Sequence, residues 1–198
     1  MSQTNSTKEK ILDVALKSFS KNSYHGTSIR DIAKEINKRE SSIYNHFKSK
    51  ESILVELITT FSKRNFGPLI LTDKLINNIS KPEKFFVLLS ENLLSFWNSE
   101  KERMFIKILL KNSKVDGMEN QYSLNHYLAD FKDLSEFIFK EMIKHKFIKK
   151  IDVATLSQEL IGPLFLFQIE TILGESSNNI HKFNLKNHVD FFWSAIRK

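Results

Sequence analysis

The sequence predicts an all-α protein with an N-terminal three-helix head, which contains a helix-turn-helix, and a longer helical body. The chain has only five glycines and three prolines among 198 residues, so signals that break regular structure are few. Apolar residues recur three and four positions apart along most of the chain, which is the spacing of an amphipathic helix. Capping boxes, each a Ser followed three residues later by an acid, mark the starts of the first two helices.

The composition is that of an ordinary globular protein, with 41% hydrophobic and 27% charged residues. The absence of cysteine excludes disulfides, thiolate metal sites and cysteine nucleophiles. The N-terminal residues have no apolar core like that of a signal peptide, and no stretch is long enough to span a membrane. We therefore expect a cytoplasmic protein.

The first helix begins at Ser6, which can form a capping box with Glu9. A loop containing Gly26 follows this helix. We expect the helix to pack across the next two helices through one apolar stripe. The stripe consists of Ile11, Leu12, Ala15, Leu16 and Phe19.

A helix-turn-helix is predicted between residues 27 and 54. Ser28 with Asp31 starts its first helix, and Asn37, a residue that tolerates the left-handed conformation, ends it. After a turn of about four residues, a second short helix directs Ile43, Tyr44 and Phe47 to one apolar surface. Such a second helix can enter the major groove of DNA. Its opposite face carries polar and cationic groups suited to base edges and phosphates, namely Arg39, Glu40, Ser41, Ser42, Asn45, His46 and Lys48.

Positive charge is concentrated in the head. Residues 1–66 carry 12 Lys and Arg against 7 Asp and Glu, a net charge of +5, whereas residues 67–198 carry 18 against 16, a net charge of +2. Of the 17 phenylalanines, 13 lie after residue 66. This distribution favours a head that faces a polyanion and a body that faces something apolar. The alternative is a solvated basic face on a helical bundle.

A fourth helix is expected from about Ser49, and Gly67-Pro68 breaks it or kinks it because proline cannot donate a backbone hydrogen bond. We place the boundary between head and body at this point. Five further helices are predicted in the body, beginning near Ser80, Ser99, Ser123 and Asp152 and after a loop at 175–179. Glu102 is expected to cap the second of these, a turn is predicted at 114–120, and Gly162-Pro163 predicts a local kink in the fourth.

The last two helices have more apolar surface than one core can bury. Residues 160–173 are apolar on more than one face, and Phe191-Phe192-Trp193 exceeds a single stripe. Paired across a two-fold axis, the two helices would form an intersubunit four-helix bundle, and the alternative is a pair buried within one monomer. The predicted dimer interface consists of Leu164, Phe165, Ile169, Leu173, Phe191, Phe192 and Ile196.

The head contains one continuous motif, in which a capped helix ending in I-A-K-E is followed by a turn and then by S-I-Y-N-H-F-K-S-K-E. These residues resemble the DNA-binding segment of the TetR family of bacterial regulators, and the resemblance covers about residues 7–58. The family's usual Gly-Val-Ser turn is replaced here by Asn37-Lys38-Arg39, which removes a capping hydroxyl. The predicted DNA-binding residues are Thr27, Ser28, Arg39, Ser41, Ser42, Tyr44, Asn45, His46, Lys48 and Lys50. The resemblance implies phosphate contacts for five of them, namely Thr27, Ser28, Tyr44, Lys48 and Lys50.

The resemblance implies a homodimeric repressor that leaves a palindromic operator when a small effector binds. On this interpretation residues 1–49 form the DNA-binding domain, residues 50–66 a connecting helix, and residues 67–198 the effector-binding and dimerisation domain. The Phe-rich body favours an apolar or aromatic effector. The expected pocket residues are Phe96, Met104, Phe105, Tyr127, Phe131, Phe137, Phe167 and Glu170.

Motifs for catalysis are missing from the sequence. It contains no GxSxG, no HExxH, no glycine-rich phosphate loop and no Asp-rich calcium loop, and its histidines lack metal-ligand spacing. We therefore expect no enzyme activity, no cofactor and no metal. Two other classes stay open: a helical-bundle small-molecule carrier or enzyme that uses the aromatic body, and an architectural nucleic-acid binder without an effector.

Overall fold

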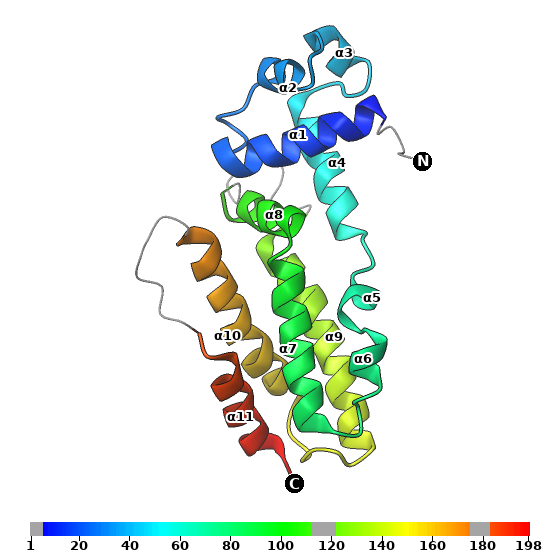
Figure 1. Ribbon diagram of the computed structural model, residues 1–198. Coiled ribbons are helices and arrows are strands. Elements are labelled where there is room, and N and C mark those ends of the chain that lie inside the picture. Colours follow the sequence, from blue (N-terminus) through cyan, green and yellow to red (C-terminus); the bar gives the residue numbers. More distant parts are fainter. Residues whose placement is uncertain (1–5, 112–121, 175–182) are drawn as a thin grey trace. The chain divides into compact units, whose positions relative to one another are not determined.

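The computed structural model describes residues 6–111, 122–174 and 183–198, and their regular structure is entirely helical (Figure 1). The prediction of an all-α fold is confirmed. The chain divides into two compact units, one made of Met1–Arg64 with Glu100–Asn125 and the other of Asn65–Ser99 with His126–Lys198. The helices are α1 (Thr7–Asn22), α2 (Ile29–Glu35), α3 (Glu40–Tyr44), α4 (Lys50–Ser62), α5 (Gly67–Ile70), α6 (Asp73–Ile76), α7 (Pro82–Trp97), α8 (Glu100–Lys111), α9 (Leu124–Lys144), α10 (Val153–Leu173) and α11 (Leu185–Ile196).

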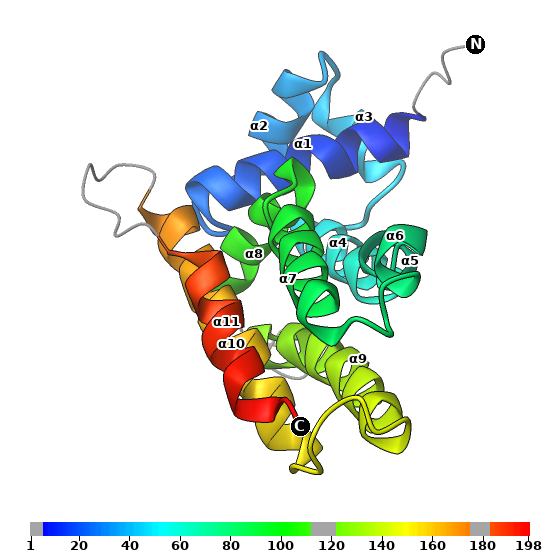
Figure 2. The same ribbon diagram turned by 60° about the horizontal axis from the view of Figure 1, so that its bottom comes forward.

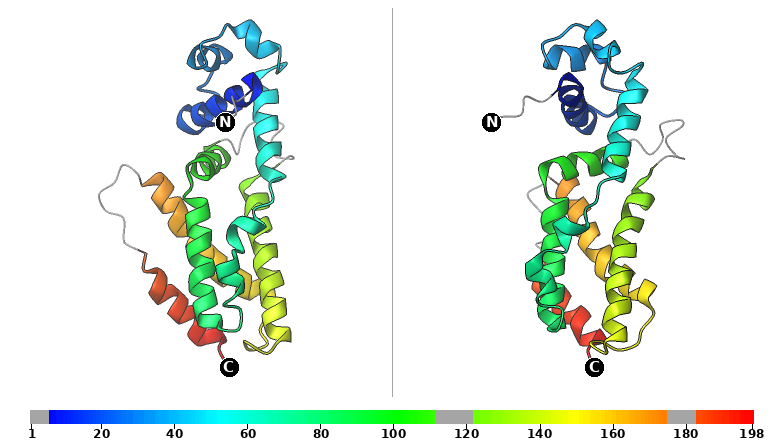
Figure 3. Two further views of the ribbon diagram at one scale, coloured as in Figure 1. Left: turned by 45° about the vertical axis from the view of Figure 1, so that its right-hand side comes forward. Right: turned by 90° about the vertical axis from the view of Figure 1, so that its right-hand side faces the viewer.

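Helix α1 is the centre of the first unit. It begins with the predicted capping box, in which the Glu9 N–H donates to Ser6 Oγ at 3.3 Å and the Ser6 N–H donates to Glu9 Oε2 at 2.7 Å. Ile11, Ala15 and Phe19 are fully buried, and α1 packs against α2, α4 and α8. Helix α8 lies on the side of α1 opposite to α2 and α3 (Figures 1 and 3).

Helix α8 belongs to the first unit, although its sequence position after residue 67 predicted that it would belong to the body. Lys101 Nζ forms an ion pair with Asp13 Oδ1 at 2.7 Å, and Lys111 Nζ donates to the carbonyl oxygens of Ser20 and Lys21 at 2.8 and 2.9 Å. These contacts join both ends of α8 to α1. The functional division at residue 67 stays a prediction.

Helix α8 begins at Glu100, directly after Ser99, as the pair of Ser99 and Glu102 predicted, and Glu102 also has a partner far away in the sequence. Its side chain is 1% exposed, and its Oε2 accepts a hydrogen bond from Arg64 Nη2 at 2.6 Å. Arg64 lies 38 positions away in the sequence, beyond the end of α4. A pattern confined to three residues therefore could not reveal this partner.

The second unit is built around α7, against which α5, α6, α10 and α11 pack (Figure 3). The Phe86 ring lies 5.7 Å from that of Phe139 on α9 and 5.4 Å from that of Phe192 on α11. Nearer the other end of α7, the Trp97 ring lies 5.2 Å from Phe131 and 5.1 Å from Phe165. Aromatic residues therefore form much of this core.

Helices α5 and α6 were not predicted, because each has only four residues and shows no periodicity. The predicted connecting helix over residues 50–66 is too long, because α4 ends at Ser62, five residues before Gly67, and Gly67 and Pro68 are the first two residues of α5. The five predicted body helices correspond to α7 through α11. The turn expected at 114–120 and the loop expected at 175–179 lie outside the described residues.

Helices α10 and α11 lie on the same side of α7 in the second unit (Figure 2). They have apolar residues on two faces, as predicted, but of the predicted interface residues only Leu173 and Phe191 are exposed. Leu164, Phe165, Phe192 and Ile196 are buried within the unit, and Ile169 is half-buried. The residues that face outward are Leu166, Leu173 and Phe191, with exposed fractions of 59%, 65% and 74%. Helix α10 is continuous through Pro163, and a kink there stays a prediction.

The residues predicted to line an effector pocket are divided between the two units. Phe137 and Glu170 are exposed, so the structure contradicts their placement in a pocket. Met104 and Phe105 lie on α8 in the first unit, where the Phe105 ring stacks on that of Phe61 at 4.2 Å. The remaining predicted residues belong to the second unit, where Tyr127 and Phe131 are buried and Phe96 and Phe167 are half-buried.

Candidate DNA-binding surface

The first helix of the helix-turn-helix, α2, begins with a complete capping box. The Asp31 N–H donates to Ser28 Oγ at 3.1 Å, while the Ser28 N–H and hydroxyl donate to Asp31 Oδ2 at 2.9 and 2.6 Å. The hydrogen bonds from the Ser28 hydroxyl and N–H hold the pKa of Asp31 below its ordinary value. Ser28 is exposed, but its hydroxyl proton is already donated to Asp31, so a bond to a phosphate would have to replace this one.

The unusual turn after α2 is a Schellman motif. Asn37 has a φ of 54°, so the predicted left-handed conformation is confirmed. The Asn37 N–H donates to the Lys34 carbonyl at 3.0 Å, and the Lys38 N–H donates to the Ala33 carbonyl at 2.9 Å, which is the bonding pattern of this motif. Asparagine is among the few residues other than glycine that adopt this backbone conformation readily, which explains how the turn forms without the family's glycine.

The second helix, α3, begins at Glu40, and the side chain of its N-cap residue, Arg39, forms no capping hydrogen bond, as the sequence predicted. The Ser42 N–H donates instead to the Arg39 carbonyl at 2.9 Å. Ile43 is fully buried and Phe47 is 5% exposed, and these two residues fix α3 to the head. Tyr44, which was expected to share this buried surface, is 53% exposed, because it points to the opposite side of the helix.

Seven exposed residues on and beside α3 form what we call the α3 surface. Arg39 and Lys48 lie at its two ends, and neither forms an ion pair with any described residue. Ser42 is half-buried beside it. The cations can contact phosphates or guanine edges, and the short polar groups can contact base edges. The α3 surface consists of Arg39, Glu40, Ser41, Tyr44, Asn45, His46 and Lys48.

Two residues predicted to contact phosphates have other roles in the structure. Lys50 Nζ donates to the carbonyl oxygens of Tyr24 and Thr27 at 2.7 and 2.8 Å and lies 4.2 Å from the centre of the Tyr24 ring. Burial lowers the pKa of Lys50. Thr27 is 2% exposed, and its hydroxyl donates to the Ser23 carbonyl at 2.9 Å. Both side chains therefore hold the loop between α1 and α2 in place, and they are withdrawn from the predicted phosphate contacts.

Neither a metal site nor a membrane-spanning helix is seen in the parts of the chain that the structure describes. These parts contain no group of three or more His, Asp or Glu side chains placed to hold a metal ion. None of the described helices is long and apolar enough to cross a membrane.

A capped helix-turn-helix with an exposed cationic and polar second helix defines a protein of the helix-turn-helix DNA-binding class. Residues 11–57 match the sequence profile of the family "Bacterial regulatory proteins, tetR family". The chain is 30% identical over 159 residues, 80% of each chain, to the Staphylococcus aureus protein "Biofilm operon icaADBC HTH-type negative transcriptional regulator IcaR". The chain belongs to the TetR family and is a DNA-binding transcriptional regulator.

Other relatives agree with this assignment. The "Fatty acid metabolism regulator protein" of Bacillus subtilis is 24% identical over 157 residues, which are 78% of this chain and 77% of that protein. A putative TetR-family regulator from Mesorhizobium loti has the same fold, with a TM-score of 0.68, 20% identity and coverage of 96% of each chain. FadR from Bacillus subtilis, solved in complex with stearoyl-CoA, has a TM-score of 0.62 at 20% identity, with coverage of 94% of this chain and 95% of that chain.

Proposed function

We propose that this regulator is a homodimeric repressor that binds a palindromic operator through its α3 surface and is released by a small apolar effector held in the second unit. The observation that carries the DNA-binding part is the α3 surface. It places two exposed cations beside short polar side chains, on a helix that the buried Ile43 and Phe47 fix to the head. The Staphylococcus aureus relative is a negative transcriptional regulator, which supports repression.

On the DNA side, the proposal separates residues that position the protein from residues that read sequence. Arg39, Tyr44 and Lys48 would contact the phosphate backbone, and Arg39 can also contact a guanine edge. Ser41 and Asn45 would contact base edges in the major groove. Two such surfaces related by a two-fold axis must lie about one helical turn apart, roughly 34–36 Å, to bind one face of the duplex.

The proposed dimer uses the outward face of α10 and α11. Leu166, Leu173 and Phe191 are more than half exposed, although all three are large and apolar. A second copy of the chain would remove this surface from water, in the way that a four-helix bundle joins two subunits. The predicted interface is therefore revised: Leu173 and Phe191 stay in it, Leu166 is added, and the four buried members leave it.

The proposed effector site lies among the aromatic residues of the second unit. Trp97 is fully buried between the rings of Phe131 and Phe165, and its Nε1 makes no hydrogen bond with any described residue. An unpaired buried donor is costly, and an acceptor on a bound molecule would satisfy it. The stearoyl-CoA bound to the structural relative supports a ligand with a long apolar chain.

The proposal is tested by selecting duplexes from a random pool with the full-length protein and then titrating ligands against the selected site. We expect an enriched palindrome, and we expect stearoyl-CoA to weaken binding to it by tenfold or more, because the ligand stabilises a state that DNA does not. Coenzyme A without its acyl chain is the control and should leave the affinity unchanged. A protein that binds stearoyl-CoA but enriches no DNA sequence would be a carrier, and the proposal would be wrong.

A further inference from the structure

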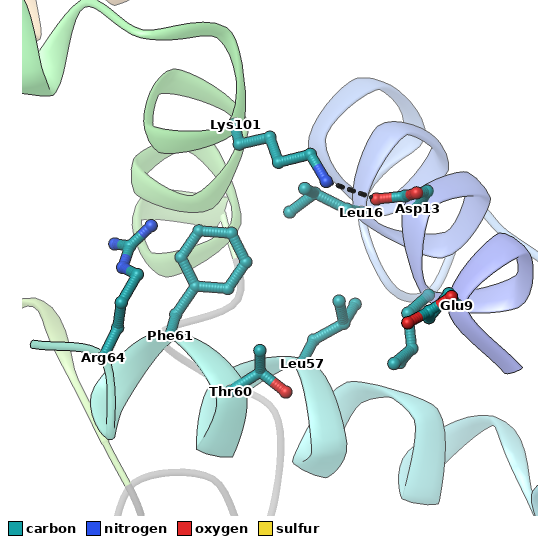
Figure 4. Close-up of a pocket in the computed structure, with 9 residues that line it drawn as sticks. Glu9, Asp13, Leu16, Leu57, Thr60, Phe61, Arg64 and Lys101 are labelled. Atoms are coloured by element: carbon teal, nitrogen blue, oxygen red, sulfur yellow. Dashed lines mark hydrogen bonds and ion pairs between the residues drawn. The ribbon is translucent and has the colours of Figure 1, made fainter. Parts of the chain in front are cut away.

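A pocket of about 360 Å³ lies between α1, α4 and α8, within the first unit (Figure 4). The α3 surface does not include it, and the proposed effector site belongs to the other unit. A volume of this size is in the range of small-molecule sites in proteins. The pocket is therefore a candidate for a second ligand site, located in the DNA-binding head itself.

The lining of this pocket is amphipathic. Leu12 and Leu16 from α1 and Leu57 and Phe61 from α4 supply an apolar surface. Figure 4 shows Phe61 and Leu57 pointing from α4 toward the space that α1 faces from the other side. The Phe61 ring is held in place by stacking on Phe105 at 4.2 Å. This surface can accept a small aromatic or aliphatic group.

The charged groups of the pocket leave an excess of negative charge at its α1 end. Asp13 pairs with Lys101 at 2.7 Å, and Arg64 pairs with the buried Glu102 at 2.6 Å. Glu9 accepts a hydrogen bond from the Ser6 N–H at 2.7 Å, but it forms no ion pair within the described residues. Glu9 and Asp13 are four residues apart on α1, so their carboxylates lie on the same face of the helix.

The position of Arg64 decides which end of the pocket a cation would occupy. Its guanidinium lies 4.6 Å from the centre of the Phe61 ring, and Figure 4 shows it at the end of the pocket opposite to Glu9. A ligand cation is repelled from the Arg64 end and attracted to the Glu9 end. An anionic ligand would have to meet Arg64, whose charge is already balanced by Glu102.

We propose that this pocket binds a small amphipathic organic cation. Its ammonium group would donate hydrogen bonds to the carboxylates of Glu9 and Asp13, and its apolar body would lie on Leu12, Leu57 and Phe61. The bound cation would connect α1 to α4. This site is independent of the effector proposed for the second unit, so either proposal can fail without the other.

The probe for the test is 4-phenylbutylammonium, titrated into the full-length protein and followed by calorimetry and by methyl NMR of labelled leucines. We expect one equivalent to bind with a dissociation constant below about 1 mM and to shift the methyl signals of Leu12, Leu16 and Leu57. The anion 4-phenylbutyrate has nearly the same apolar body and should bind at least tenfold more weakly. Equal binding of both compounds, or no binding of the cation at 10-fold higher concentration, would overturn the proposal.

Variants locate the binding to this pocket. Glu9→Gln keeps a residue type that supports the capping box, and Asp13→Asn keeps the size and shape of the side chain while it weakens the exposed ion pair with Lys101, so both proteins should fold. Each substitution should lower the affinity for the cation by about tenfold, as expected for the loss of a charged hydrogen bond. Thr60→Trp should block the pocket, because Thr60 is an exposed residue at its edge. Glu83→Gln, which removes an exposed carboxylate from α7, is the control. Unchanged binding to Thr60→Trp would refute the assignment.

Discussion

Arg39 is the residue at which stability and DNA binding are most directly opposed. It stands at the N-cap of α3, where a serine or threonine would accept a hydrogen bond from the backbone, and its side chain caps nothing. A cation gains nothing from the partly positive start of a helix. Because Arg39 is exposed and forms no ion pair with any residue that the structure describes, its guanidinium is available to DNA.

The change Arg39→Ser restores a capping hydroxyl. We expect the free head to gain about 1 kcal/mol of stability, seen as slower amide exchange at Ser42 and Ile43. Operator affinity should fall at the same time, because a phosphate or guanine contact is lost. Both quantities are measured on the same protein, by hydrogen-exchange NMR and by fluorescence anisotropy. An operator affinity that is unchanged or higher would show that Arg39 does not contact DNA.

Lys48 and Lys50 form a matched pair, two residues apart, with opposite expected roles. Lys48→Ala should lower the affinity for all DNA duplexes by the same factor, with no loss of protein stability. It should also lower by about one the slope of log affinity against log salt concentration. Lys50→Met should instead lower the free energy of unfolding by about 2 kcal/mol, because it leaves two partly buried carbonyls without their donor. Urea denaturation and salt-dependent anisotropy separate the two effects. If Lys50→Met changes only the salt slope, the structural role assigned to Lys50 is wrong.

At the scale of elements, helix ends were predictable and long-range partners were not. The caps at Ser6 and Ser28 and the left-handed Asn37 depend on neighbours within a few residues, so a short pattern contains the full signal. Lys50 bonds to carbonyls 26 and 23 positions away, and no local pattern reveals such partners.

Which apolar residues are buried and which are exposed was only partly predictable, because burial also depends on parts of the chain that are distant in the sequence. Helix α10 is apolar on nearly every side, so the spacing of its apolar residues does not show which side faces the core. The sequence therefore could not predict that Phe165 is buried and Leu166 exposed. The same ambiguity applies to Phe191 and Phe192 on α11. For the pocket residues, exposed Phe137 could not be told from buried Phe131 by residue type alone.

The junction of α4 and α8 depends on the buried pair of Arg64 and Glu102. Arg64→Met should destabilise the protein by about 3 kcal/mol, because a buried carboxylate loses its guanidinium partner. We take the lower end of the usual range, since the Arg64 side chain is 31% exposed. The double variant Arg64→Met/Glu102→Met should recover most of this loss in a urea-denaturation cycle. A double variant less stable than Arg64→Met would contradict the assigned pairing.

At the scale of the whole molecule, the dimer proposal predicts different results for two neighbouring phenylalanines. Phe191→Glu should give folded monomers, because it places a charge in the proposed interface between copies. Phe192→Glu should unfold the second unit, because the Phe192 ring packs against Phe86 and Phe139. Phe137→Glu, at a similarly exposed phenylalanine on α9, is the control and should leave the dimer intact. Sedimentation equilibrium with circular dichroism distinguishes these outcomes, and a Phe191→Glu dimer would move the interface elsewhere.

The central claim is that the α3 surface reads DNA sequence, and Asn45 tests it most directly. The measurement is the relative affinity of the wild type and of Asn45→Ala for every single-base variant of the selected operator. We predict that Asn45→Ala loses discrimination at one position in each half-site, by about 1–3 kcal/mol, and keeps the others. The account would be contradicted by a wild-type protein that discriminates at no position, or by an Asn45→Ala protein that binds all variants uniformly more weakly.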